Sequence, residues 1–140
     1  MLTDINEGKT LPPVVKHITQ EKINLYAEAS GDFNPIHVDE SFAVKTPFGG
    51  TIAHGMLNLA YVSEMMTVAF GRNWLSGGKL RAKFKEVARP GDTLTISSTV
   101  NSIEKKDGVS YANCSFEVRN QKGEVVVAGE ATAKFSRGQD

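Results

Sequence analysis

Cysteine is nearly absent from this chain of 140 residues, which contains Cys114 and no other thiol. One thiol cannot form an intramolecular disulfide or supply the thiolate ligands of a structural zinc site. A chain without disulfides is typical of a reducing compartment, so we expect a cytoplasmic protein.

An excess of charge is also missing, because sixteen Lys and Arg balance sixteen Asp and Glu. Binding to nucleic acid or to an anionic membrane surface depends on clustered positive charge, so neither partner is expected. The longest apolar run, Met56–Phe70, is too short for a bilayer, and MLTDINEGKT at the start does not match a signal peptide. We therefore predict neither a membrane span nor a signal peptide.

The composition is that of one ordinary folded domain. Hydrophobic residues make up 40% and charged residues 23% of the chain, a balance that excludes a disordered protein. A chain of this length has enough residues for one core but not for two, so we expect a single domain over residues 1–140.

The first third of the chain predicts a strand, a helix and a long loop. Val14–Ile18 predicts the strand, and Thr19 is a good N-cap for a helix that Gly31 ends. The segment Asp32–Ala53 is rich in Gly, Pro and Asn and is predicted as a loop with a helical turn after Asp39. A loop of that length in a small domain is usually functional.

A long helix is predicted over Gly55–Phe70 and ends at Gly71. Apolar side chains surround this segment instead of forming one stripe, a pattern typical of a helix that is buried on nearly every side.

The second half of the chain follows the two-residue period of strands. The positions expected to face inward are Leu80, Ala82 and Phe84, then Leu94, Ile96, Ser98 and Val100, then Ala112, Cys114, Phe116 and Val118, and finally Val125, Val127, Ala131, Ala133 and Phe135; all of them but Ser98 are apolar. Turn sequences such as Asp107-Gly108 separate the later runs. The pattern predicts an antiparallel meander of about four strands.

Burial then dictates the architecture, because a sheet with one apolar face needs a cover and an apolar helix needs wrapping. We expect an α+β arrangement of the kind called a hotdog fold, in which the sheet curves around the long helix. A single unit would leave sheet edges and part of the helix exposed, so a homodimer or larger homo-oligomer is expected.

Titratable side chains gather within the long loop, in the segment Ser30–Asp39. Asp32 and His37 are five residues apart, and Pro35 restricts the backbone between them. Asn34 can hydrogen-bond the local backbone and hold the turn. Each residue alone is more often structural than catalytic, but a carboxylate and an imidazole that share a water can move protons in both directions.

Three segments carry a family resemblance: YAEASGDFNPIHVD at Tyr26–Asp39, FGGTIAHGM at Phe48–Met56 and RPGDTL at Arg89–Leu94. The first resembles the hydratase-2 motif of the MaoC-like family, which includes the (R)-specific enoyl-CoA hydratases, and the resemblance continues in the family's order over nearly the whole chain. It implies that Asp32 and His37 are the catalytic pair.

The start of the long helix supplies the second half of the predicted site. Backbone N–H groups at Gly55 have no partner within the helix, so a thioester carbonyl placed there would be polarised. The resemblance implies this role for the Gly55 amide, whereas the alternative is a glycine that only permits tight packing.

The family often has a serine at the position of Ser63 that supports the active-site hydrogen bonds. The alternative there is a hydroxyl bonded to the carbonyl four residues earlier.

The remaining polar residues receive simpler interpretations. His54 is predicted to cap or orient the start of the helix, and the three histidines lack metal-ligand spacing, so no metal is expected. A basic stripe of four exposed positions is interpreted as a solvated face, with docking of substrate phosphates as the alternative. It consists of Lys79, Arg81, Lys83 and Lys85.

With these residue features, the resemblance implies a hydro-lyase that interconverts trans-2-enoyl-CoA and (R)-3-hydroxyacyl-CoA. No cofactor is expected, because the thioester itself acidifies C2. The alternatives are a dehydratase acting on acyl-carrier-protein thioesters, a thioesterase, and a non-catalytic acyl-CoA-binding module. The sequence departs from the family at Glu86-Val87 and in Gly71–Gly78, two segments that can shape the acyl pocket.

Overall fold

The structure is a computed structural model that describes residues 1–136 of the chain. Its five strands are β1 (Val14–His17), β2 (Lys79–Phe84), β3 (Thr93–Lys106), β4 (Val109–Arg119) and β5 (Val125–Phe135). Its helices are α1 (Gln20–Ser30), α2 (Pro35–Val38), α3 (Glu40–Ala43), α4 (Gly55–Phe70) and α5 (Arg72–Leu75). The strands form one antiparallel sheet in the order β1-β3-β4-β5-β2.

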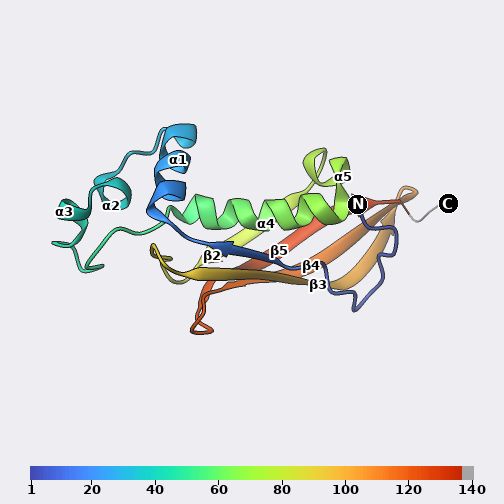
Figure 1. The fold of residues 1–140 in the computed structure, drawn as a ribbon. Coiled ribbons are helices and arrows are strands. Elements are labelled where there is room, and N and C mark those ends of the chain that lie inside the picture. Colours follow the sequence, from blue (N-terminus) through green and yellow to red (C-terminus); the bar gives the residue numbers. More distant parts are fainter. Residues whose placement is uncertain (137–140) are drawn as a thin grey trace.

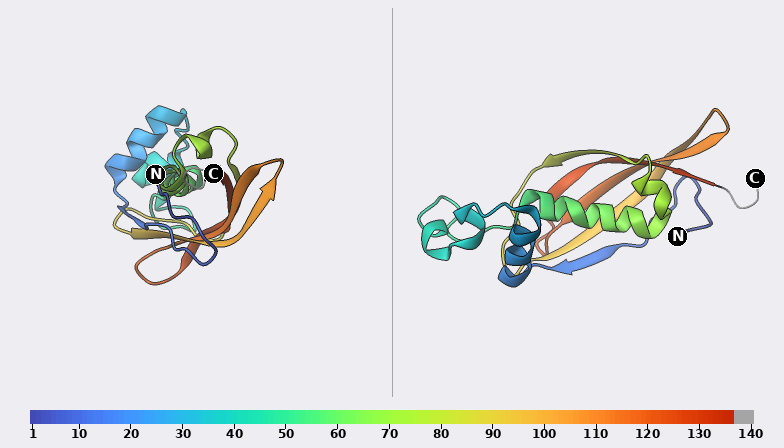
Figure 2. Two further views of the ribbon diagram at one scale, coloured as in Figure 1. Left: turned by 90° about the vertical axis from the view of Figure 1, so that its right-hand side faces the viewer. Right: turned by 90° about the horizontal axis from the view of Figure 1, so that it is seen from above.

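The sheet curves around α4, as the view along the helix shows (Figure 2), and this confirms the predicted α+β hotdog arrangement. Helices α1 to α3 lie at the N-terminal end of α4, and α5 lies at its C-terminal end (Figure 1). The long loop of the sequence analysis is therefore gathered where α4 begins. Among residues 1–136, no helix has the length and hydropathy that a membrane span requires.

The core lies between α4 and the concave face of the sheet. Its largest fully buried side chains include Val62, Met65, Met66 and Phe70 from α4, and Leu94, Ile96, Val100, Phe116 and Val118 from β3 and β4. Each such side chain contributes about 1.5–3 kcal/mol of transfer free energy. The Cys114 thiol is buried among them, and desolvation raises its pKa to about 11. A thiol in that environment is an inert core residue.

The prediction that α4 is buried on nearly every side is wrong for the single chain. One stripe of the helix faces away from the sheet, and the side chains of Met56 and Val68 on it are 58% and 51% exposed. One curved sheet covers only one side of a helix. The sheet alone therefore does not explain why α4 has apolar side chains on all its faces.

The predicted four-strand meander is also only partly correct, because β2 is not a neighbour of β3. Strands β3, β4 and β5 form the meander, and β2 pairs with β5 at the far edge, where Leu80 and Phe84 remain exposed. The connection from β2 to β3 crosses the end of the sheet, where Ala53 N–H donates to the Ala88 carbonyl at 2.7 Å. This crossing brings residues 84–89 beside the start of α4.

Candidate active site

A short helix, α2, stands where the sequence predicted only loop. The Asn34 side chain caps it by accepting a hydrogen bond from Ile36 N–H at 3.1 Å, and Pro35 occupies the first helical position. An Asn-Pro pair is a recognised start signal for a helix, so this element was within reach of the sequence. The predicted turn-holding role of Asn34 is confirmed, and α3 matches the helical turn predicted after Asp39.

Asp32 follows the Gly31 residue that ends α1 in a left-handed conformation, at φ 79°. Its Oδ1 accepts a hydrogen bond from Asn34 N–H at 3.2 Å, and its own N–H donates to the Ser30 hydroxyl at 3.2 Å. These contacts fix the main chain on both sides of the residue. The side chain is 53% exposed, and Oδ2 is the carboxylate oxygen that faces His37.

His37 lies in the last turn of α2 with its side chain only 12% exposed. Its Nδ1 lies 2.8 Å from the Ile52 carbonyl, which can only accept, so Nδ1 carries the proton of the neutral ring. The bare Nε2 then points toward Asp32, 3.9 Å from Oδ2. This distance is too long for a direct hydrogen bond, but one water about 2.8 Å from each atom spans it. The geometry therefore suits two groups that share one water.

The position of α2 is fixed from both sides. Gln20 of α1 donates to the His37 carbonyl at 2.8 Å and accepts from the Thr51 hydroxyl at 2.6 Å. Ile52 N–H donates to the Ile36 carbonyl at 3.2 Å. Helix α1, helix α2 and the extended segment before α4 are thus held together around the His37 ring.

Gly55 is the first residue of α4, directly after His54, whose ring contacts His37. No group among the described residues accepts from Gly55 N–H, as expected at a helix N-terminus. A Cβ at this position would lie 3.1 Å from the Phe84 ring, so the residue is also tightly packed. The structure thus fits both interpretations of Gly55, the amide donor and the packing glycine.

Ser63 lies two turns further along α4, away from the pair. Its hydroxyl accepts a hydrogen bond from the Trp74 indole of α5 at 2.8 Å. No hydrogen bond among the described residues joins it to Asp32 or His37. Within this chain Ser63 anchors α5, and neither interpretation from the sequence anticipated that contact.

Asp32, His37 and His54 could each offer one ligand atom to a metal ion, since three such atoms lie within 4.8 Å of one another. The rings of His37 and His54, however, are stacked at 3.9 Å between centroids with only 26° between their planes. The lone pairs of imidazole lie in the ring plane, so those of stacked rings run side by side and do not converge on one ion. This geometry suits a proton-transfer site better than a chelate.

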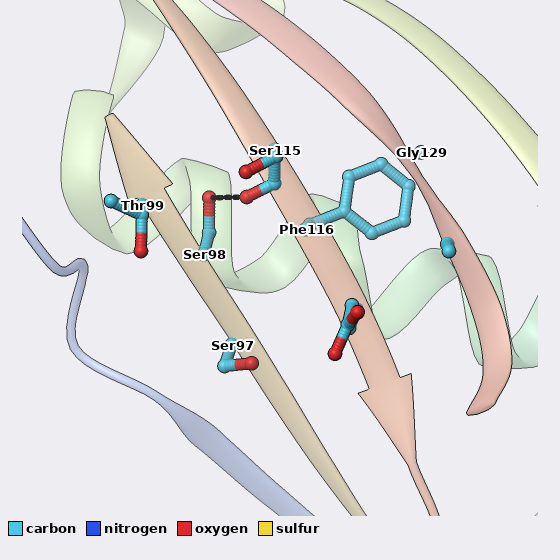
Figure 3. Close-up of a pocket in the computed structure, with 8 residues that line it drawn as sticks. Ser97, Ser98, Thr99, Ser115, Phe116 and Gly129 are labelled. Carbon is cyan, nitrogen blue, oxygen red and sulfur yellow. Dashed lines mark hydrogen bonds between the residues drawn. The ribbon is translucent and has the colours of Figure 1, made fainter. Parts of the chain in front are cut away.

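Two of the hollows in the surface of the described residues differ in their relevance to the site. One of about 350 Å³ is lined mainly by small and hydroxyl residues of β3, β4 and β5, where the Ser98 hydroxyl donates to the Ser115 carbonyl (Figure 3). It holds no acid–base pair. The second, of about 310 Å³, is lined by Phe48, Phe84, Lys85, Glu86, Val87 and Arg89. Because Phe84 contacts Gly55, this second hollow opens at the start of α4.

Comparison with known proteins agrees with this geometry. The chain is 36% identical over 131 residues to an (R)-specific enoyl-CoA hydratase of Rhodospirillum rubrum. The alignment covers 92% of this chain and 87% of that protein. It is 30% identical to a 3-hydroxybutyryl-CoA dehydratase of Methylorubrum extorquens, covering 89% of this chain and 78% of that protein.

Among solved structures, an R-hydratase of Pseudomonas aeruginosa in unliganded form aligns with a TM-score of 0.79 and 31% identity. The alignment covers 92% of this chain and 81% of that chain. The family model for the MaoC like domain matches residues 5–122, a range that includes Asp32, His37 and Gly55. The chain therefore belongs to the MaoC-like domain family.

Proposed function

We propose that this chain catalyses the reversible, (R)-specific hydration of trans-2-enoyl-CoA to (R)-3-hydroxyacyl-CoA. The observation that carries the proposal is the 3.9 Å separation of His37 Nε2 and Asp32 Oδ2 beside the start of α4. Two proton-transfer groups and an unpaired helix N-terminus are the parts that addition of water to an enoyl thioester needs. The names of the relatives point to the same reaction class.

In the hydration direction the water held by Asp32 and His37 attacks C3. One residue of the pair accepts the proton that this water loses, and the electrons of the double bond move toward the thioester carbonyl. The Gly55 amide stabilises the resulting enolate charge. The pair starts with one transferable proton, which is on the residue that does not act as the base. That residue gives its proton to C2 on the same face, while the proton taken from water stays on the base. The product thus gains H and OH, and the pair again holds one proton, which returns to the first residue before the next turnover.

The hollow beside Phe84 is where the carrier of the acyl group would approach. Its lining includes Phe48, Phe84 and Val87, whose apolar side chains suit the thioester arm. It also includes the cations Lys85 and Arg89, which suit phosphate groups, beside the carboxylate of Glu86. An acyl-carrier-protein thioester is the second candidate substrate, and the basic stripe along and just after β2, which is exposed, is the observation that favours it. Comparing kcat/KM for one acyl group on the two carriers decides between them.

The proposed reaction is tested by adding crotonyl-CoA or octenoyl-CoA to the pure protein and following two signals. We expect loss of the enoyl-thioester absorbance without release of a free thiol. Release of thiol would identify a thioesterase instead. A flat signal in both assays with both substrates would contradict the proposal and favour an acyl-CoA-binding module.

We also propose that the chain forms a homodimer through the β2 edge of the sheet. This edge has unpaired backbone groups and exposes Leu80 and Phe84, and apolar Met56 and Val68 are exposed on α4. An edge strand whose backbone groups are unpaired is a template for pairing with another strand, and the exposed apolar side chains would be covered by a second copy.

Light scattering at micromolar concentration should therefore return a mass of at least about twice the 15.2 kDa of the chain. Replacing the exposed Leu80 by Lys puts a charge at one of the two exposed large apolar positions of β2 and should shift the population toward monomer. A value near that of one chain for the unmodified protein would contradict the dimer.

A further inference from the structure

His54 contacts both members of the pair, although it was predicted only to cap or orient α4. It is 2% exposed, and its side chain makes no capping hydrogen bond to the helix. Its ring stacks on the His37 ring at 3.9 Å between centroids. Its Nε2 lies 3.0 Å from the Asp32 carbonyl oxygen, and the Tyr26 ring packs against it edge-on, with 4.8 Å between the ring centroids.

We propose that His54 is the positioning residue that sets the distance between the Asp32 carboxylate and His37 Nε2. The inference rests on the proposed function and assigns His54 to the same site. One ring holds both groups: its N–H fixes the main chain of Asp32, and its face fixes the plane of the His37 ring.

This constraint matters because the rest of the site leaves both groups partly free. The Asp32 side chain is more than half exposed, and Asn34 N–H is the hydrogen-bond donor to its carboxylate among the described residues. The His37 ring is held along one edge by the Ile52 carbonyl, a contact that still allows the ring to tilt. A displacement of about 1 Å between reacting groups can lower a rate about a hundredfold.

The nitrogens of His54 indicate positioning and not proton transfer. The Asp32 carbonyl can only accept, so Nε2 of His54 carries the proton and is occupied by that hydrogen bond. Its Nδ1 is buried and has no hydrogen-bond partner among the described residues. Nε2 is therefore engaged by the main chain and Nδ1 is shielded from solvent, an arrangement that favours positioning over proton exchange.

Two variants separate the hydrogen bond of His54 from its ring. His54→Phe keeps an aromatic face against His37 but loses the N–H to Asp32, and His54→Gln keeps an N–H of similar reach but loses the ring. We expect His54→Phe to lower kcat for crotonyl-CoA about 10- to 100-fold with KM changed less than about twofold. The kcat of His54→Gln should be at least threefold higher than the kcat of His54→Phe. His17→Gln is the matched control, because His17 is an exposed histidine of β1 whose ring contacts Thr93 and not Asp32 or His37.

The decisive comparison repeats His54→Phe in the Asp32→Asn background. A residue that acts through Asp32 should then have little further effect on kcat, within about threefold. If His54 is only a core residue, both variants will lower the melting temperature while kcat per folded molecule stays near wild type, and the inference is wrong. If the unmodified protein fails to hydrate any enoyl-CoA, the proposed function is wrong and this inference falls with it.

Discussion

Replacing Asp32 by Asn, or His37 by Ala, should lower kcat by roughly 10²–10⁴ while the chain stays folded. In the Asp32→Asn variant the new amide oxygen can still accept from Asn34 N–H, as Oδ1 of Asp32 does, so the turn survives while the proton-transfer group is lost. Turnover of an enoyl-CoA and a melting curve on the same preparation check this expectation.

The two positions need different controls because they carry different structural contacts. His37→Ala removes the hydrogen bond to the Ile52 carbonyl, whereas His37→Asn keeps an N–H at the place of Nδ1 and removes only Nε2. Asp39→Asn is the control for the carboxylate. Hydrogen bonds from the Ser41 hydroxyl and Phe42 N–H lower the pKa of Asp39, which serves as the cap of α3. Its substitution should leave kcat within about twofold, and a stable Asp32→Asn at full activity would show that the pair is wrongly assigned.

Gly55→Val should lower kcat/KM at least tenfold, or about 1.4 kcal/mol of transition-state stabilisation. The donor is a backbone N–H that no side-chain deletion removes, so the test is to crowd the space where the thioester carbonyl must lie. Ser63→Ala should cost less, because its hydroxyl contacts Trp74 and not the pair.

The packing explanation of Gly55 makes a different prediction, and the Phe84 ring provides the means to test it. Because Phe84 also lines the hollow proposed for the substrate, the reference for the double variant is Phe84→Ala alone. If the 3.1 Å distance from a Cβ at residue 55 to the Phe84 ring is all that matters, Gly55→Val should change neither the melting temperature nor kcat/KM in the Phe84→Ala background. If the amide polarises the substrate, Phe84→Ala should restore the melting temperature and leave most of the kcat/KM loss. A Gly55→Val protein that is destabilised but fully active would leave the amide without a catalytic role.

The elements of the fold were accessible from the sequence, because most of their boundaries are set locally. Helix α1 begins after Thr19, which accepts from Lys22 N–H at 3.1 Å, and α4 has the predicted bounds Gly55–Phe70. The order of the strands was not accessible. Alternation in Lys79–Phe84 indicates a strand but not its neighbour, which is set by the long connection that carries the chain across the sheet.

The candidate site shows the same division between local and distant information. The cap at Asn34 and the loop that holds Asp32 and His37 could be predicted from residues close together in the chain. The contacts of His54 could not be predicted in this way. His54 is 17 positions from His37 and 22 positions from Asp32, and it meets them only after α1, α2 and α4 have packed. The one available signal was the place of His54 directly before Gly55. The Trp74 contact of Ser63 depends in the same way on how α5 folds back on α4.

The most direct test of the account is the double variant Asp32→Asn/His37→Asn, compared with each single variant for turnover of crotonyl-CoA. If both side chains act on one shared water, either substitution already disables that water. The double variant should then lose no more than about tenfold beyond the slower single variant. If the two losses multiply in full, so that two reductions of about 10³ give one of about 10⁶, the residues act independently and the shared-water site is contradicted.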